Sequence, residues 1–264
     1  MLRVMTWNLW WRFGPWWARQ AAIGEVLAAQ QADLIGLQEV WVEESGANQA
    51  EVLAHRLGYH WRVGELHFRD GLAFTNAIIS RWPIQTTFRA RLPDGAGDLS
   101  HRQVLGVRVT TGVGPVLFVT THLDWAFDAS PTRRAQLQAV CQLIAAERPD
   151  PEHGYPAILT GDLNATPAAD ELRMMTGAAP VAVPGLAFVD AWEVAGGGQP
   201  GHTWNGANPY LADAGYPNRR LDYVMVSWPR PKPMGSVAGV WMAGVAPVDG
   251  VIASDHYAVV ADLR

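Results

Sequence analysis

The segment from Ile158 to Pro167 follows a short apolar run and presents a carboxylate and an amide. Asp162 and Asn164 are two residues apart, so in an extended chain their side chains point the same way. A carboxylate at a strand end can bind a hard cation or accept a proton from water, and an amide can orient a group without adding charge. Gly161 lets the backbone approach a ligand closely. The alternative interpretation is an ordinary Asx-type turn, and the rest of the chain has to decide between the two.

Other strand-like runs also begin or end with polar side chains that an apolar core does not require. In chain order these side chains are Asn8, Glu39, His122, Asp222, Asp255 and His256. A carboxylate beside an apolar run is costly unless it is paired or binds a metal. An adjacent acid and imidazole suit metal binding or proton transfer. Each residue alone has a simpler structural interpretation, but the repetition at strand after strand predicts a shared polar site.

The elements that position these residues follow from the hydrophobic periodicity and the capping signals. The predicted helices are Trp16–Gln30, Glu44–Leu57 closed by Gly58, Ser130–Glu147, and a helix that starts at Thr166–Pro167 and runs to about Met175. The predicted strands are Leu2–Leu9, Asp33–Val40, Tyr59–Glu65, Gly71–Ser80, Thr86–Leu92, Gln103–Thr111, Pro115–His122, a run from Ala157 to Leu159, Phe188–Trp192, a run from Asp222 to Ser227, and a last strand after His256. Strands and helices therefore alternate along most of the chain.

Composition narrows the class of protein. The chain has 264 residues, of which 49% are hydrophobic and 17% charged, and we expect one domain over residues 1–264. A net charge of -5 argues against a globally basic surface for nucleic acid. Cys141 is the only cysteine, which excludes an internal disulfide. The N-terminus lacks the apolar core of a signal peptide, and no stretch is long and apolar enough to span a membrane, so we expect a cytoplasmic location.

The motifs Thr-Trp-Asn, Gln-Glu-Val, Thr-His-Leu, Gly-Asp-Leu-Asn, Arg-Leu-Asp-Tyr and Ser-Asp-His occur in this order between Thr6 and Ala261. In that order they resemble the endonuclease/exonuclease/phosphatase superfamily of deoxyribonuclease I-like metal-dependent phosphoesterases. The resemblance implies an α+β fold, a four-layer α/β/β/α sandwich with two mixed β-sheets packed face to face and helices outside. It also implies hydrolysis of a phosphoester bond by metal-assisted attack of water.

The resemblance implies a metal site with three contributors. Glu39 is the principal metal ligand, Asn8 helps to hold the metal or a phosphate oxygen, and Asp255 supports the site. Carboxylate and amide oxygens are the ligands that Mg²⁺ and Mn²⁺ prefer, and either ion is the expected cofactor. A divalent cation neutralises an anionic phosphodiester and polarises its P–O bond.

The resemblance also implies the catalytic roles of five residues. Asp162 orients or deprotonates the attacking water, and Asn164 assists at the phosphate or the metal. His256 contacts the phosphate or serves in proton transfer, and Asp222 orients its imidazole. His122 contacts the phosphoryl oxygens, whose developing charge imidazole donors can stabilise.

The substrate is a separate question. Trp125 and Trp204 lie just past strand ends or in a late loop and are predicted to bind substrate, as are Asn8 and Asn76. An aromatic rim would receive a planar or apolar leaving group; the alternative is that the rings only cover the sandwich end. The segment Trp10–Trp17 is a further candidate, for contact with a membrane interface.

Three interpretations of the function remain at this point. A small-molecule or lipid head-group phosphodiester is the favoured substrate, because the chain is acidic and its loops carry more tryptophan than paired basic residues. A DNA-directed endo- or exonuclease is the alternative, with nucleic acid a less favoured partner. A catalytically silent phosphate-binding protein on the same fold is the third, and intact Glu39, Asp162 and His256 argue against it. The sequence does not decide the oligomeric state.

Overall fold

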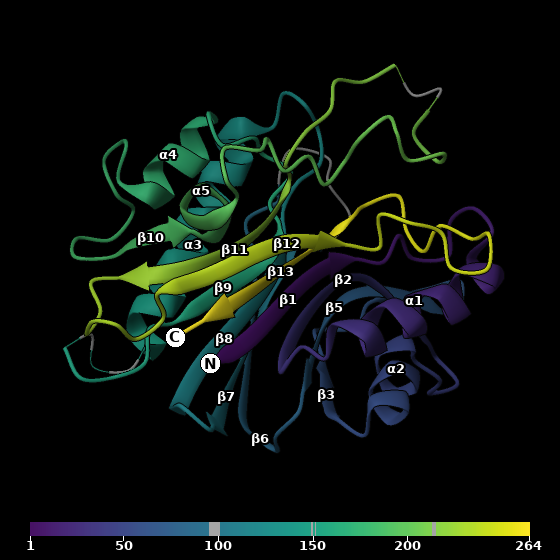
Figure 1. Ribbon diagram of the computed structural model, residues 1–264, viewed down its shortest axis with the longest axis horizontal. Helices are drawn as coiled ribbons and strands as arrows, with labels where there is room; N and C mark the ends of the chain where they lie inside the picture. Colours follow the sequence, from purple (N-terminus) through teal and green to yellow (C-terminus); the bar gives the residue numbers. More distant parts are fainter. Residues whose placement is uncertain (95–100, 149, 151, 213–214) are drawn as a thin grey trace.

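Two mixed β-sheets packed face to face form the centre of the structure, a computed structural model that describes residues 1–94, 101–148, 150, 152–212 and 215–264 (Figure 1). The strands of the first sheet are β1 (Leu2–Asn8), β2 (Leu34–Glu43), β3 (His60–Val63), β4 (Phe68–Arg69), β5 (Leu72–Ser80), β12 (Val237–Ala243) and β13 (Ala258–Leu263). Their order is β12-β13-β1-β2-β5-β3, with β4 paired to β5. Within this sheet only β1 and β2 pair in parallel among the described residues.

The second sheet is built from the middle of the chain. Its strands are β6 (Ile84–Arg91), β7 (Gln103–Thr111), β8 (Gly114–His122), β9 (Ile158–Asp162), β10 (Ala187–Asp190) and β11 (Asp222–Trp228). Their order is β10-β11-β9-β8-β7-β6, and β8 and β9 are the parallel pair. The chain then returns to the first sheet, where β13 pairs with β1.

Helices cover the outer face of each sheet, which completes four layers (Figure 1). These helices are α1 (Trp16–Gln30), α2 (Gln49–Leu57), α3 (Ser130–Glu147) and α4 (Asp170–Thr176). The short helix α5 (Ala191–Ala195) instead contributes Ala191 and Trp192 to the buried cluster between the sheets. Ile23 of α1 and Leu53 of α2 belong to one buried cluster with Trp7 of the first sheet. Leu137 of α3 and Leu172 of α4 belong to another buried cluster, with strands of the second sheet. The predicted α/β/β/α sandwich is therefore confirmed.

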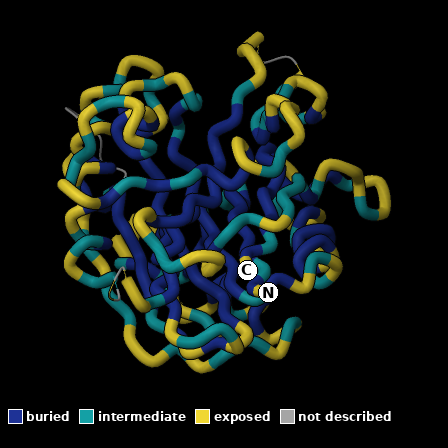
Figure 2. Tube along the Cα trace, turned by 60° about the vertical axis from the view of Figure 1, so that its left-hand side comes forward, coloured by how far each residue is buried: buried dark blue, intermediate teal, exposed yellow. Residues whose placement is uncertain are grey.

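A third buried cluster lies between the sheets and holds them together. Leu2, Val4 and Leu34 from the first sheet join Phe118 and Ile158 from the second in this cluster. Figure 2 shows the same division, with the buried trace in the centre and most exposed segments around it. Burial of such apolar surface is the main favourable contribution to folding.

The sheets also meet through a polar layer near one end of the sandwich. Gln38 of β2 donates from Nε2 to the hydroxyls of Thr6 at 3.2 Å and Thr120 at 2.8 Å. A Cβ on Gly36 would come within 2.3 Å of Oγ1 of Thr160 and 2.7 Å of Oγ1 of Thr120. Gly36 is therefore required for the two sheets to approach each other at this point.

Several predicted element bounds were wrong. Helix α2 begins at Gln49 and not at Glu44, because the Asn48 side chain accepts a hydrogen bond from the backbone N–H of Glu51 and so caps the helix there. Helix α4 begins at Asp170 and not at Thr166–Pro167, because the Thr166 carbonyl closes a separate turn with the N–H of Ala169.

The predicted strand Phe188–Trp192 ends at Asp190, whose side chain caps the short helix α5. No helix in the described part of the chain is both long and apolar enough to cross a membrane. The predicted single domain and the cytoplasmic location stay predictions.

Candidate active site

The alternation of side chains along the strands directs polar end residues into the space between the sheets. In β1, Val4 belongs to the core between the sheets, and Asn8 lies four residues further on, so both face the same side. The same spacing of two or four residues from a core residue holds for His122 after Phe118, Asp162 after Ile158, and Asp222 before Val224. The ends of β1, β8, β9 and β11 therefore converge on one site.

Glu39 reaches this site through a β-bulge. Leu37 and Val40 of β2 pair with neighbouring strand β5, but the register shifts between them, so Gln38 and Glu39 both stand opposite Asn76. Strict alternation would place Glu39 on the helix-covered face with Leu37. The bulge, with Glu39 at a φ of 56°, turns its carboxylate toward Asn8 instead.

Asn8 connects carboxylates from the two sheets. Its Nδ2 donates to Oε1 of Glu39 at 3.0 Å and to Oδ2 of Asp162 at 3.0 Å. Its Oδ1 accepts a hydrogen bond from the N–H of Trp10 at 2.9 Å. The amide of Asn8 is thus placed to orient both acids.

Two imidazoles flank the same oxygen of Asp162. Nε2 of His122 lies 3.5 Å from Oδ2 of Asp162, and Nε2 of His256 lies 3.8 Å from that atom. The other ring nitrogen of His256, Nδ1, is 2.8 Å from Oδ2 of Asp222. Asn164 lies beside them: its N–H donates to Oδ1 of Asp162 at 2.9 Å, and its side chain donates to the Leu123 carbonyl. The structure therefore brings together all five residues predicted as catalytic.

The two imidazoles differ in charge. Burial, together with Arg102 and His256, holds the pKa of His122 well below its usual value, so this ring is neutral. Burial alone would lower the pKa of His256 too, but Asp222, Asp162 and Asp255 outweigh it and raise that pKa well above its usual value. His256 is therefore an imidazolium facing an acidic site, and His122 a neutral ring beside it.

Buried carboxylates supply the electrostatic condition for a metal. Burial, and secondly the nearby Asp255, raise the pKa of Glu39 to about 7. Burial likewise raises the pKa of Asp255, and that of Asp162 to about 6. Among the described residues, Oε2 of Glu39 is buried without a hydrogen-bond partner. Buried acids close to one another are what a bound divalent cation would neutralise, so these side chains fit the predicted ion.

A second candidate set for a cation overlaps the imidazole pair. One ligand atom each from Asp162, Asp222 and His256 lie within 4.8 Å of one another. Nδ1 of His256 is occupied by Asp222, but Oδ1 of Asp222, like Oε2 of Glu39, is buried without a hydrogen-bond partner among the described residues. Both sets therefore offer a free carboxylate oxygen to a cation, and the role of Glu39 as the principal ligand stays a prediction.

Two supporting residues were not predicted from the sequence. Ser254 donates from Oγ to the Asn8 carbonyl at 2.7 Å, which ties the segment before β13 to β1. The Thr203 hydroxyl accepts from the N–H of Asp222 at 3.2 Å, and its carbonyl accepts from the N–H of Tyr257. Ser254 belongs to the Ser-Asp-His motif and Thr203 to the polar loop before Asp222. Their closeness in sequence to predicted site residues was the signal that could have found them.

The structure gives its own reason for glycine at position 161. The φ of Gly161 is 155°, and a Cβ there would meet the carbonyl oxygen of Thr121 at 2.2 Å. Glycine is therefore required by the close approach of strands β8 and β9, while its predicted approach to a ligand stays a prediction.

A cavity of about 430 Å³ opens over the site and is walled by aromatic rings. The lining rings are Trp10, Phe13, Phe74, Trp125, Phe127, Trp204 and Tyr216. The lining polar residues are Glu39, Arg102, His122, Asp162, Asn164, Arg219, Asp255 and His256. Trp125 is 66% exposed and Phe127 52%, so rings at the rim are available to a ligand.

Asn76 does not line this cavity. Its side chain is buried and donates to the Gln103 carbonyl at 3.1 Å, behind His122. The predicted contact of Asn76 with substrate stays a prediction.

The comparison with known families decides the assignment. The model of the endonuclease/exonuclease/phosphatase family matches residues 5–256. The chain belongs to this family. Its members are metal-dependent phosphoester hydrolases, so the protein is an enzyme of this class that depends on a divalent metal. The possibility of a catalytically silent protein is set aside on this ground.

Solved structures share the fold across the whole chain. D. rerio TDP2 complexed with a single-strand DNA product is 22% identical, with a TM-score of 0.77 over 98% of this chain and 97% of that one. An endonuclease/exonuclease/phosphatase from Beutenbergia cavernae is 25% identical, with a TM-score of 0.74 over 100% of this chain and 71% of that one. One from Bacteroides vulgatus is 18% identical, with a TM-score of 0.75 over 100% and 98%. No curated protein sequence matches.

The loop from Leu9 to Phe13 beside the site depends on one buried arginine. Arg19 of α1 donates from its two terminal nitrogens to the carbonyls of Leu9, Trp10, Trp11, Phe13 and Ala253, at 2.7 to 3.0 Å. Its side chain therefore donates to five backbone acceptors, of which only the Trp10 carbonyl also accepts from a backbone N–H outside the helices and strands, that of Phe13, among the described residues.

We expect Arg19→Met to lower the free energy of unfolding by about 3 kcal/mol, because the buried carbonyls lose their donor. Urea denaturation measures this change in the free energy of unfolding. Arg134→Met removes the same charge from an exposed position of α3 and should change stability by less than about 0.5 kcal/mol. Equal stability of the two variants would show that the loop finds other donors.

The aromatic segment 10–17 is partly packed onto the protein. The Trp10 ring lies 4.7 Å from that of Tyr210, and Nε1 of Trp11 donates to the Ala73 carbonyl. Trp17 is 74% exposed and stacks on Trp16 at 4.0 Å. Contact of this segment with a membrane stays a prediction.

Proposed function

We propose that the protein hydrolyses a small-molecule or lipid head-group phosphodiester bound in the aromatic-walled cavity over Asp162. The observation that carries this proposal is the composition of the cavity wall. Seven rings surround a single cluster of acids and imidazoles, and within the described part of the chain only two arginines, Arg102 and Arg219, line the same cavity. Such a wall suits a planar or apolar group beside one phosphate better than a run of phosphates.

In the proposed reaction Asp162 orients the attacking water and accepts its proton. Its Oδ1 is fixed by the N–H of Asn164, and its Oδ2 by Asn8, so the carboxylate has one orientation. His256, held by Asp222, donates to a phosphoryl oxygen and stabilises the charge that develops there. His122 contacts the phosphoryl group from the other side of Asp162.

Glu39 and Asp255 would hold the metal in this proposal, with Asn8 supporting them. A bound Mg²⁺ or Mn²⁺ supplies charge neutralisation at the phosphodiester. Asn8 keeps Glu39 and Asp162 close together, which places the metal-holding acid beside the acid that handles the water.

A DNA-directed phosphodiesterase is the second candidate. The structural similarity to TDP2, solved with a single-strand DNA product, supports it, as do Arg102 and Arg219 at the cavity. The aromatic wall is compatible with a single strand, whose bases stack on such rings. The two candidates differ in how many phosphates the protein must contact.

We expect binding of DNA to depend weakly on salt. One or two phosphate contacts give a slope of log K against log [salt] of about -1 to -2, whereas a nuclease that follows a longer backbone gives a steeper one. Binding is measured with the Asp162→Asn variant between low and moderate salt. A slope steeper than about -4 with tight binding would favour the nuclease.

The same experiment has an activity arm. For a diester without a second charged group, such as bis(4-nitrophenyl) phosphate, we expect Trp125→Ala or Trp204→Ala to lower kcat/KM more than loss of any one arginine at the cavity. The reason is that ring contact, and not charge, supplies most of the affinity for such a substrate. Exposed Trp17, which lies outside the cavity lining, provides the control as Trp17→Ala.

A further inference from the structure

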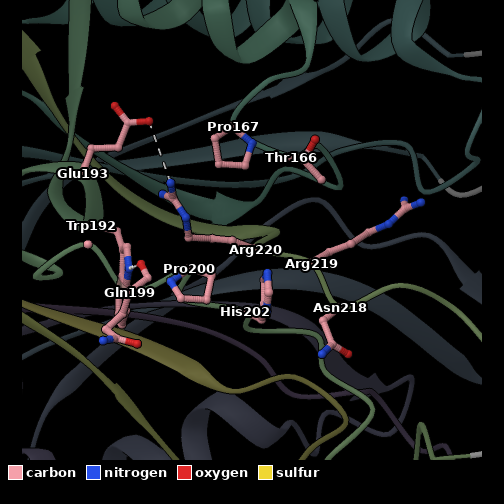
Figure 3. Close-up of a pocket in the computed structure, with 11 residues that line it drawn as sticks. Thr166, Pro167, Trp192, Glu193, Gln199, Pro200, His202, Asn218, Arg219 and Arg220 are labelled. Carbon is pink, nitrogen blue, oxygen red and sulfur yellow. Dashed lines mark hydrogen bonds and ion pairs between the residues drawn. The ribbon is translucent and has the colours of Figure 1, made fainter.

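A second cavity, of about 440 Å³, lies beside the catalytic cavity, and Arg219 lines both. Figure 3 shows it with Thr166 and Pro167 above, His202 and Asn218 below, and Arg219 at one end. Nothing in the proposed reaction uses this second cavity. Its position next to the scissile phosphate makes it available to a further part of the same substrate.

The backbone explains why the two cavities adjoin. Trp204 and Arg219 form an antiparallel bridge, with hydrogen bonds of 2.9 and 2.8 Å between their backbone groups. Trp204 lines the catalytic cavity, and Asn218, which precedes Arg219, lines the second. The side chain of Arg219 therefore forms the boundary between them.

The two neighbouring arginines differ in their partners. Arg220 is buried, pairs with Asp190, and has Nη2 3.8 Å from Glu193, so its charge is balanced. In the parts of the chain that the structure describes, no carboxylate forms an ion pair with Arg219, whose guanidinium lies 4.2 Å from the Phe127 ring. Figure 3 shows Arg219 extending away from Glu193, toward the opposite end of the cavity. A positive charge without a counter-charge therefore stands at the junction.

Further hydrogen-bonding groups face the second cavity. Within the described residues, the side chains of His202, Gln199 and Thr166 form no hydrogen bond to the protein. Asn218 accepts from the N–H of Gly206 at 2.9 Å, which leaves its amide N–H groups for a ligand. An unpaired guanidinium with neutral donors around it is an arrangement that suits an oxyanion.

We propose that Arg219 and this cavity bind a second phosphoryl group of the same substrate molecule, next to the phosphodiester that is cleaved. This inference rests on the proposed function, because it needs a phosphodiester in the neighbouring cavity. It narrows the substrate class to phosphodiesters that carry a second phosphate. Such a phosphate can belong to a nucleotide or to a phosphorylated lipid head group.

The test uses matched pairs of substrates. The nucleotide pair is thymidine 5′-(4-nitrophenyl phosphate) with and without a 3′-phosphate, and the head-group pair is glycerophosphoinositol with and without a 4-phosphate. In at least one pair, the second phosphate should raise kcat/KM about tenfold or more, the scale of one charge-assisted contact. The pair that responds identifies the source of the phosphate.

Variants of Arg219 test the assignment. Arg219→Met should bring the ratio of kcat/KM within the responding pair close to one, and Arg219→Lys should restore part of it by keeping the charge. Arg134→Met, which removes the same charge at an exposed position, should keep the full ratio. Equal kcat/KM within both pairs, or a preference that survives Arg219→Met, would overturn the inference.

A binding measurement separates this inference from the proposed function. Calorimetry on the metal-free protein compares thymidine 3′,5′-bisphosphate with thymidine 5′-monophosphate, and inositol 1,4-bisphosphate with inositol 1-phosphate. In at least one pair the bisphosphate should bind more tightly, and Arg219→Met should remove the difference. If no diester is cleaved with Mg²⁺ or Mn²⁺ but this difference is found, the proposed function fails and the second phosphate site stands. Equal binding within both pairs would count against the site even in an active enzyme.

Discussion

Hydrolysis of bis(4-nitrophenyl) phosphate is expected to vanish in excess chelator and to return when Mg²⁺ or Mn²⁺ is added. Glu39 and Asp255 are buried acids whose pKa values are raised by burial, and further by Asp255 for Glu39 and by Asp222 for Asp255; Oε2 of Glu39 has no partner among the described residues. Without a cation these acids repel an anionic phosphodiester. With a bound divalent cation, the site attracts the phosphodiester.

The Glu39→Gln variant tests where the metal is held. It keeps the size of the side chain and an oxygen that can accept from Asn8, but removes the charge. We expect the concentration of Mg²⁺ needed for half-maximal rate to rise at least tenfold, because loss of even an outer partner of a metal ligand typically weakens metal binding by about 10- to 100-fold. Glu44→Gln removes an equal charge from an exposed position and should leave that concentration unchanged. Full turnover in excess chelator would refute the metal requirement outright.

Asp162→Asn is expected to lower kcat by about two to four orders of magnitude, the usual loss for a general acid–base group. The amide retains an oxygen for the N–H of Asn164, but it cannot take a proton from water. The fold should survive, because Asp162 stands at a strand end, and circular dichroism and urea denaturation can verify this. Asp170→Asn changes an exposed acid at the start of α4 and should keep normal turnover.

His256→Ala should lower kcat over the same range, and it provides a test of Asp222. If Asp222 acts through the imidazole 2.8 Å away, adding Asp222→Asn to His256→Ala should cost little more. Additive losses in the double variant would mean that Asp222 has a separate role. Near-normal turnover of either single variant would show that its role is misassigned.

The polar strand ends could be predicted from sequence, because an apolar run that stops at an acid, amide or imidazole is visible without a structure. The way these residues are arranged in space could not be predicted from the sequence. Asn8 and Asp162 are 154 residues apart and share a hydrogen bond only because the sandwich brings β1 opposite β9. Glu39 is the clearest case in which sequence alternation fails to predict the direction of a side chain. Period-two alternation places Glu39 on the outer face, and the bulge turns it inward.

Local turn chemistry explains other errors. Both interpretations of the segment after β9 hold at once, since Asp162 closes an Asx-type turn with Asn164 and also belongs to the site. The turn from Thr166 to Ala169 then delays the helix that Pro167 was expected to start. Strand β12 was missed because it is an edge strand with mostly half-buried side chains, which leaves little alternation in its sequence.

The catalytic residues come from both sheets, so turnover depends on how the two sheets are placed relative to each other. Asn8 and Glu39 belong to the first sheet and His256 lies just before its strand β13, whereas His122 and Asp162 belong to the second sheet. Turnover should therefore be sensitive to any displacement of one sheet relative to the other. A shift of a fraction of an ångström would misplace catalytic groups long before either sheet unravels. The polar contacts around Gly36 join the two sheets near the site. We therefore expect substitutions there to lower turnover before they unfold the protein.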